Sequence, residues 1–392
     1  MKIALVIERI EEWRGGAETS TLQFAQRAVE QGCDLTLISA SRGQLPPGLA
    51  LLTVKAPGLW RSRRTARFVQ AATAAIRRGG FDLVHAVTPC PGADVYEPRG
   101  GAVPETLRRN LALRHSWLAR TAKRTASRCN AKVRLLLRLE RELVQRQPGP
   151  IVVALSRYVA RQFQDHYGLT APRVRVIFNG VEPDPASLKQ READDNDIRQ
   201  QYDLQRNERL ALCVAHNFRL KGVHHVIEAV AGLPADRRHY VRVIVVGRDN
   251  PVPLMRQSRR LGVADRIVFA GSTERISAFY HAADMLVHPT YYDPCSRVVL
   301  EALGAGVPVI TTRFNGAAEV MTDGREGFIL EQPDDAAALA DRIGRLLDEP
   351  FRRDCGLAAQ RLVDLCAMRR HADEVVQLYR EILEARTCRP PK

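Results

Sequence analysis

Residues 283–319 constrain the fold of this chain more than any other stretch. The apolar run Met285 to Val287 predicts a buried strand, residues 298–305 predict a helix, and residues 307–312 predict the next strand. A strand, a helix and a second strand in this order form a βαβ unit of a parallel sheet. The unit carries two acids, Asp293 and Glu301, at the carboxyl edge of that sheet, where open α/β sheets bind ligands.

The same alternation of strands and helices runs through both halves of the chain. Further strands are predicted at residues 3–7, 35–39, 83–87, 151–155, 174–178, 209–215, 241–246 and 267–270. This pattern predicts an α/β protein with two doubly wound, Rossmann-like domains that face each other across a cleft. We expect one domain at residues 1–181 and the other at 182–371, with a polar linker at 182–200 and a last helix at 372–386.

Length, charge and cysteine usage limit the class of protein. A chain of 392 residues is too long for one ordinary core, which agrees with two domains. No apolar run approaches the roughly 20 residues that span a bilayer, and no signal-peptide pattern is present, so we expect a cytoplasmic protein. The eight cysteines show no C-x-x-C spacing, which predicts neither a disulfide framework nor a zinc site. The net charge of +15 is unusual, and residues 55–80 carry seven basic residues without an acid.

Two motifs after predicted strands suit phosphate groups. Arg219 and Lys221 stand just before Gly222 at the predicted amino terminus of a helix, where backbone N–H groups and cations attract a diphosphate. Gly15 and Gly16 follow the first strand, and glycines let a ligand approach the backbone closely. The alternatives are a solvated helix start for the first motif and a simple turn for the second.

The segment with Asp293 and Glu301 resembles the signature of the retaining glycosyltransferases of family 4, which have the GT-B fold. The family usually has Glu at the first position, where this chain has Asp. The resemblance implies that Asp293 binds hydroxyls of the donor hexose and that Glu301 binds the ribose of the nucleotide sugar. It also implies that the last helix crosses back to the first domain. Two surface carboxylates beside a structural turn are the alternative.

The same resemblance implies roles for the phosphate motifs. Lys221, with Arg219, is expected to neutralise the leaving diphosphate, and the Gly15–Gly16 loop is expected to contact the donor. At the amino terminus of the helix that bears Glu301, backbone N–H groups of three residues are expected to bind the diphosphate: Ser296, Arg297 and Val298. We therefore expect no metal, no protein nucleophile and no cofactor besides the nucleotide sugar.

Residues 81–96 resemble one subgroup of that family, the lipopolysaccharide-core glucosyltransferases of type I. Pro91 to Tyr96 matches the subgroup's P-G-x-D-V-Y sequence, which implies that Asp94 binds the acceptor hydroxyl or assists its deprotonation. His85 is a second acceptor-side candidate, although a single His at a strand end is commonly structural. The subgroup implies UDP-glucose as donor and a lipopolysaccharide core or another glycolipid as acceptor.

Residues 105–146 form a basic segment, with twelve Lys and Arg against three Glu. A basic helical stretch of this kind can bind an anionic membrane surface, nucleic acid or only solvent. No zinc finger, RNP pattern or clear helix-turn-helix supports nucleic acid. We expect membrane docking, which the subgroup also implies, and hence a peripheral protein on the inner face of the cell membrane.

The sequence thus predicts a retaining, metal-independent hexosyltransferase. Three alternatives stay open: a silent GT-B scaffold that binds nucleotide or membrane, a GDP-mannose-dependent mannosyltransferase, and a basic nucleic-acid-binding protein.

Overall fold

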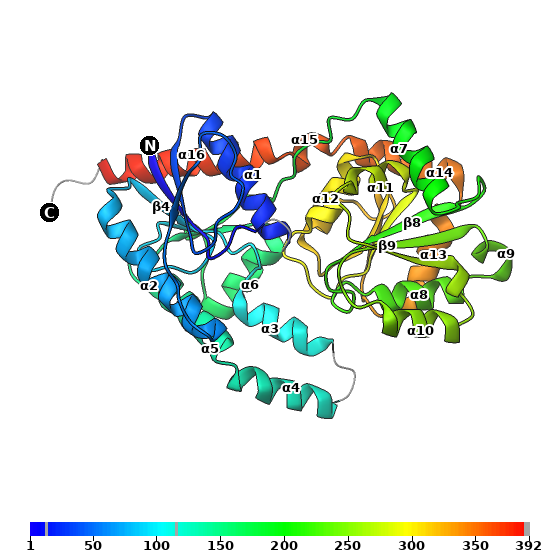
Figure 1. Cartoon of the computed structure of the whole chain (residues 1–392), viewed down its shortest axis with the longest axis horizontal. Helices are drawn as coiled ribbons and strands as arrows, with labels where there is room; N and C mark the ends of the chain where they lie inside the picture. The colour runs from blue at the N-terminus through cyan, green and yellow to red at the C-terminus, as the bar shows by residue number, and fades with distance from the viewer. Residues whose placement is uncertain (12–14, 114–116, 388–392) are drawn as a thin grey trace. The chain divides into compact units, whose positions relative to one another are not determined.

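The computed structural model describes residues 1–11, 15–113 and 117–387, and the chain forms two compact units (Figure 1). The first unit comprises Met1–Gly180 and Met368–Lys392, and the second comprises Val181–Ala367. Each unit is built on its own parallel sheet with helices on both faces. The two doubly wound, Rossmann-like domains that the sequence predicts are therefore present.

The sheet of the first unit has seven strands in the order β3-β2-β1-β4-β5-β6-β7. Its strands are β1 (Lys2–Val6), β2 (Asp34–Ser39), β3 (Ala50–Thr53), β4 (Leu83–Ala86), β5 (Val95–Tyr96), β6 (Ile151–Ala154) and β7 (Val174–Val176). Along β1, Ile3 and Leu5 face one core while Ala4 and Val6 face the other. Such a strand is apolar at every position because both faces are covered. The strand order reverses between β1 and β4.

Helices cover both faces of this sheet. They are α1 (Gly16–Glu30), α2 (Arg61–Gly79), α3 (Val103–Ala112), α4 (Trp117–Cys129), α5 (Ala131–Gln145), α6 (Arg157–Tyr167) and α16 (Met368–Thr387). Helices α1 and α16 supply one core, where Phe24 packs with Val375 and Tyr379. Helices α2, α5 and α6 supply the other core. Ser156 is the N-cap residue of α6, and its hydroxyl accepts the Val159 N–H.

The sheet of the second unit has six strands in the order β10-β9-β8-β11-β12-β13. Its strands are β8 (Arg209–Val214), β9 (Val241–Val246), β10 (Ile267–Gly271), β11 (Met285–His288), β12 (Val309–Thr312) and β13 (Gly327–Leu330). All pairings are parallel. The order reverses between β8 and β11, which makes the loops after these two strands the expected ligand site of the unit.

The helices of the second unit are α7 (Leu188–Gln201), α8 (Val223–Gly232), α9 (Ala235–Arg238), α10 (Val252–Arg260), α11 (Ile276–Ala282), α12 (Arg297–Gly304), α13 (Ala336–Leu346), α14 (Glu349–Gln360) and α15 (Val363–Cys366), with the 3-10 helices η2 (Ala264–Arg266) and η3 (Gly316–Val320). Helices α8 and α13 pack their apolar residues on one face of the sheet. Helices α11 and α12 lie on the other face (Figure 1).

Some local features differ from the sequence prediction. Residues 182–200, expected as a linker, contain most of α7, where Ile198 is buried and Asp194 accepts hydrogen bonds from His281 and Arg275. The short strands β3, β5 and β13 were not predicted. The seven cysteines in the described residues are free, and Cys388 lies outside them. None of the described helices is long and apolar enough to cross a bilayer.

Candidate functional site

Two loops of the second unit meet where its strand order reverses. Gly222, at the end of the loop after β8, has φ of 70°, and a Cβ there would lie 2.2 Å from the carbonyl oxygen of Pro289 in the loop after β11. Only glycine therefore allows this approach. The Tyr291 N–H also donates to the Leu220 carbonyl over 2.9 Å. The two loops are thus fixed against each other by backbone contacts.

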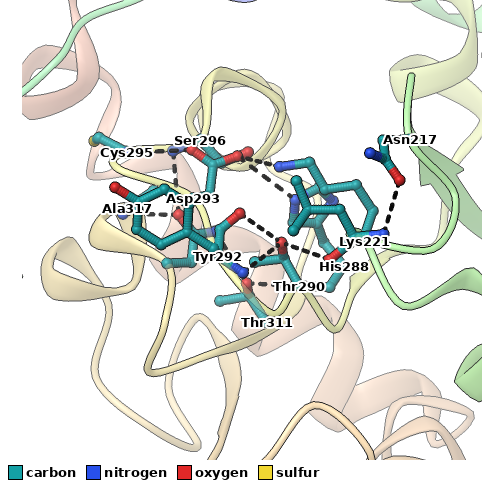
Figure 2. A network of polar contacts seen from close by, with 12 residues as sticks. Asn217, Lys221, His288, Thr290, Tyr292, Asp293, Cys295, Ser296, Thr311 and Ala317 are labelled. Atoms are coloured by element: carbon teal, nitrogen blue, oxygen red, sulfur yellow. Dashed lines mark hydrogen bonds and ion pairs between the residues drawn. The ribbon is translucent and has the colours of Figure 1, made fainter. Parts of the chain in front are cut away.

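This junction brings Lys221 and Asp293 together, as Figure 2 shows. The Lys221 ammonium donates to Oδ2 of Asp293, and both side chains are less than one-fifth exposed. Oδ1 of Asp293 accepts the Cys295 N–H over 3.2 Å, and the Asp293 N–H donates to the Phe314 carbonyl over 3.0 Å. The site therefore holds one anchored carboxylate and one ammonium with further hydrogen-bonding capacity.

His288, the last residue of β11, points at the same carboxylate (Figure 2). Its Nε2 lies 4.0 Å from Oδ2 of Asp293, and the side chain is buried. Burial, and next the charge of Lys221, lower the pKa of His288 well below 6.5, so the imidazole is neutral at pH 7. The buried Nε2 has no hydrogen-bond partner within the described part of the chain. A buried polar atom of this kind at the carboxyl end of a strand marks a contact that a ligand or water completes.

Helix α12 begins beside this pair. Oδ1 of Asn315 accepts the N–H of Ser296 over 3.1 Å and that of Ala317 over 3.0 Å. The expectation that the Ser296 N–H binds a diphosphate is therefore wrong for this conformation, because that donor is already used. The Ser296 side chain does not cap α12, so it does not occupy the first N–H groups of the helix. That the Arg297 and Val298 N–H groups bind the diphosphate stays a prediction.

Glu301 lies in the second turn of α12. Its Oε1 accepts from Arg297 over 2.9 Å, and its Oε2 accepts from the Tyr280 hydroxyl over 2.9 Å. Burial, and next the Glu301 charge, raise the pKa of Tyr280 well above 10, so the hydroxyl stays a donor. The carboxylate is one-quarter exposed and keeps lone pairs for a ligand hydroxyl.

Arg219 lies in the same loop as Lys221 but on its exposed side. Burial is the main cause that raises the pKa of Tyr291 to about 12. The positive charge of Arg219 acts in the opposite direction and lowers this pKa in part. The structure places Lys221, Asp293, Ser296, Arg297 and Glu301 in one region of the second unit.

The Gly15–Gly16 motif lies in the first unit, at the carboxyl edge of its sheet. Gly16 begins α1, and Gly15 is its N-cap residue without a side chain to cap the helix. This is the loop after β1, where the strand order reverses, so the position suits a ligand contact.

Asp94 lies at the opposite edge of that sheet. Its Oδ2 accepts the Val84 N–H over 2.9 Å near the start of β4, and its Oδ1 accepts from Arg386 of α16. It directly precedes β5, so it stands where parallel strands begin. This placement contradicts the expected role at the acceptor, because ligands bind where the strands end. Asp94 instead fixes α16 to the sheet.

His85 is a buried core residue. It is fully covered, its Nδ1 bonds the Tyr379 hydroxyl, and its Nε2 lies 3.3 Å from Glu97. Burial lowers the pKa of His85. Glu97 also pairs with the buried Arg99 over 2.8 Å. A covered imidazole cannot touch an acceptor, so the expectation for His85 is wrong and its structural alternative is right.

Sequence reasoning missed three residues of the site. His288 directly follows one predicted strand and Asn315 lies three residues after another, positions that signal a ligand edge. Tyr280 carried no such signal, because it reaches Glu301 from α11. Within the described residues, no group of three His, Cys, Asp or Glu side chains converges as metal ligands would.

Comparisons with known proteins give matches across both units. The model described as "Glycosyltransferase Family 4" matches residues 14–185, and that described as "Glycosyl transferases group 1" matches residues 194–362. The lipopolysaccharide glucosyltransferase WaaG of Escherichia coli K12 is 25% identical, over 86% of this chain and 88% of its own length. A D-inositol 3-phosphate glycosyltransferase of Acidothermus cellulolyticus is 27% identical, over 95% and 87% respectively.

Solved structures share the fold. The crystal structure of WaaG, a glycosyltransferase involved in lipopolysaccharide biosynthesis, has a TM-score of 0.82 at 24% identity and covers 96% of this chain and 99% of its own. Anabaena Alr3699/HepE in complex with UDP-glucose has a TM-score of 0.70 at 21% identity, with coverage of 98% and 100%.

Proposed function

Since the chain belongs to glycosyltransferase family 4 and has the GT-B fold, we propose that it moves glucose from UDP-glucose to a hydroxyl of a glycolipid or lipopolysaccharide-core acceptor. The relative named for lipopolysaccharide glucosyl transfer supports this choice of sugar and acceptor. The neighbour crystallised with UDP-glucose supports the choice of donor.

The observation that carries the proposal is the Lys221–Asp293 pair at the switch point of the second unit. The Lys221 ammonium would pair with a diphosphate bound on its exposed side, while hydroxyls of the hexose donate hydrogen bonds to Asp293. Asp is one methylene shorter than the usual Glu, but the Cys295 N–H holds its carboxylate in place. Glu301, oriented by Arg297 and Tyr280, accepts from the ribose hydroxyls.

The proposed reaction retains the anomeric configuration. The bond between the anomeric carbon and the diphosphate oxygen breaks, and its electron pair leaves with UDP. The acceptor oxygen bonds to the same face of that carbon, and its proton passes to the departing phosphate oxygen. Lys221 stabilises the negative charge that develops there, with Arg219 and the first N–H groups of α12 as further donors.

We propose that this reaction needs no metal ion. The charge that a divalent cation would supply to the diphosphate comes instead from Lys221 and Arg219. Activity that is equal with a chelator and with added Mg²⁺ supports this proposal, and activity that requires the cation refutes it.

The basic segment 105–146 is proposed to hold the enzyme at the inner face of the cell membrane; its residues 114–116 lie outside the described part. Two of its three acids are turned inward. Glu105 is buried against Arg108 and Arg109, and Glu140 accepts from Tyr96. With two of its three acids buried, the segment presents few carboxylates that would repel an anionic surface.

The first test is nucleotide binding without metal. UDP, GDP and ADP are compared by thermal shift on the wild type, on Lys221→Met and Glu301→Gln, and on the control Lys189→Met, an exposed lysine of α7. We expect UDP alone to stabilise the wild type and the control, and to lose at least about tenfold in affinity in both site variants. No stabilisation by any nucleotide would favour the scaffold alternative.

Product analysis then separates the remaining alternatives. Incubation with UDP-glucose and lipopolysaccharide-core acceptors, followed by NMR of the new linkage, tests donor, acceptor and retention together. Selective use of GDP-mannose, or of inositol 3-phosphate as acceptor, would replace the proposed substrates but keep the transferase. The latter outcome is included because a relative carries that name.

A further inference from the structure

An exposed apolar pair stands immediately before helix α2 of the first unit. Leu59 is 98% exposed and Trp60, the N-cap residue of α2, is 68% exposed. A tryptophan and a leucine side by side in solvent are costly, because a large apolar area stays hydrated. Neighbouring apolar residues that remain exposed together mark an interaction site.

The fold presents this pair in a fixed conformation. Arg67, in the second turn of α2, donates to the Pro57 carbonyl over 2.7 Å. The Arg64 N–H donates to the Trp60 carbonyl over 3.0 Å, the first bond of the helix. Gly58 packs so closely on α2 that a Cβ there would lie 3.3 Å from Arg64 Cγ. The exposed side chains therefore project from a segment that the helix itself holds.

Basic residues without neighbouring acids in the sequence surround the pair. Lys55, Arg61, Arg63 and Arg67 are exposed, and residues 55–80 contain no acid. The first turn of α2 thus holds arginines at the positive end of the helix dipole, where acids are normally favoured. An anionic surface opposite this turn removes that unfavourable interaction.

The same part of the unit borders the other basic segment. Glu8, just after β1, accepts from Thr65 of α2 over 2.7 Å and lies 3.8 Å from the ammonium of Lys132 at the start of α5. Helices α2 and α5 also contact each other. Both basic stretches therefore reach the surface near the carboxyl end of β1.

We propose that the tip formed by Leu59 and Trp60 inserts into the interfacial layer of an anionic phospholipid bilayer, while Arg61 and Arg63 bind headgroup phosphates. Tryptophan is enriched at that depth because its ring is apolar and its N–H is polar. The tip extends the proposed function, since it holds the enzyme beside a membrane-bound acceptor, but it needs no catalysis to be observed.

The test is binding to vesicles of phosphatidylglycerol and phosphatidylcholine, compared with vesicles of phosphatidylcholine alone. The variants are Leu59→Ser with Trp60→Ser, and the control Leu188→Ser, which removes an 81% exposed leucine of the second unit. We expect the double variant to lose about tenfold or more in affinity for the anionic vesicles, because two apolar side chains no longer insert. The control keeps wild-type affinity.

Tryptophan fluorescence locates the insertion. We expect the blue shift on vesicle binding to persist in Trp117→Phe and to vanish in Trp60→Phe. Vesicle binding unchanged by the double variant, or a shift that depends on Trp117 alone, overturns the proposal and leaves docking to segment 105–146. A changed oligomeric state with unchanged vesicle binding also overturns it and identifies a second copy as the occupant. UDP thermal shifts of the same variants report separately on the proposed function.

Discussion

Replacing Gly222 by alanine tests whether the two loops must touch for the site to form. The substitution forces alanine into a left-handed conformation, which costs about 1–2 kcal/mol. Its Cβ would also meet the Pro289 carbonyl oxygen at 2.2 Å, a backbone atom that cannot rotate away. Overpacking of this kind costs about 1–3 kcal/mol more, so we expect a total of about 2–5 kcal/mol.

Gly262 provides the matched control. It lies in the same unit with φ of 71°, against 70° for Gly222, but a Cβ there would meet nothing within 4 Å. Gly262→Ala therefore carries the conformational cost alone, about 1–2 kcal/mol. For a unit of this size each kcal/mol lowers Tm by about 2–4 °C, so calorimetry resolves the two variants.

The site provides the second readout of this pair of variants. Gly222 follows Lys221, so a shifted loop moves the ammonium away from Asp293 and from the proposed diphosphate. Misplacement by about 1 Å can cost about 100-fold, and we expect such a loss in kcat/KM for Gly222→Ala, against less than about twofold for Gly262→Ala. Equal Tm and equal kcat/KM in the two variants would refute the reasoning, because the contact with Pro289 would then have no consequence.

Three further predictions concern other contacts. Asp94→Asn weakens the bond to Arg386 and should lower the free energy of unfolding in urea by about 1 kcal/mol, with kcat/KM unchanged. A raised KM for the acceptor alone would restore the predicted role of Asp94. Because burial keeps His288 neutral while the unfolded chain protonates near pH 6.5, the unfolding free energy should fall below that pH; His288→Leu should flatten the profile and His239→Leu should not. Asn315→Ala leaves two buried N–H groups unpaired and should lower the free energy of unfolding by about 2–3 kcal/mol, measured by calorimetry. The variant should also bind UDP more weakly, and an unchanged stability and affinity would contradict this prediction.

The arrangement around Lys221 and Asp293 could be predicted because it depends on strand order. Strands that alternate with helices form a parallel sheet, and all their carboxyl ends meet at one edge. The loops that follow β8 and β11 then lie near one another once the two strands pair. What the sequence could not supply was the use of each hydrogen-bond donor, such as the Ser296 N–H that Asn315 occupies.

The two errors in the first unit have one physical cause. A four-residue strand such as β4 is only about 13 Å long, so a motif can lie close to a ligand edge in sequence and still stand at the other edge. Asp94 directly precedes β5 and therefore lies at the amino edge of the sheet, away from ligands. Glu97 directly follows β5 and lies at the carboxyl edge, where ligands bind. His85 lies inside β4, where its side chain enters the core and pairs with Glu97 rather than with a ligand. Because β5 has only two residues, no periodicity could reveal it, and the edge on which each acid lies became visible only with the register of β4 and β5.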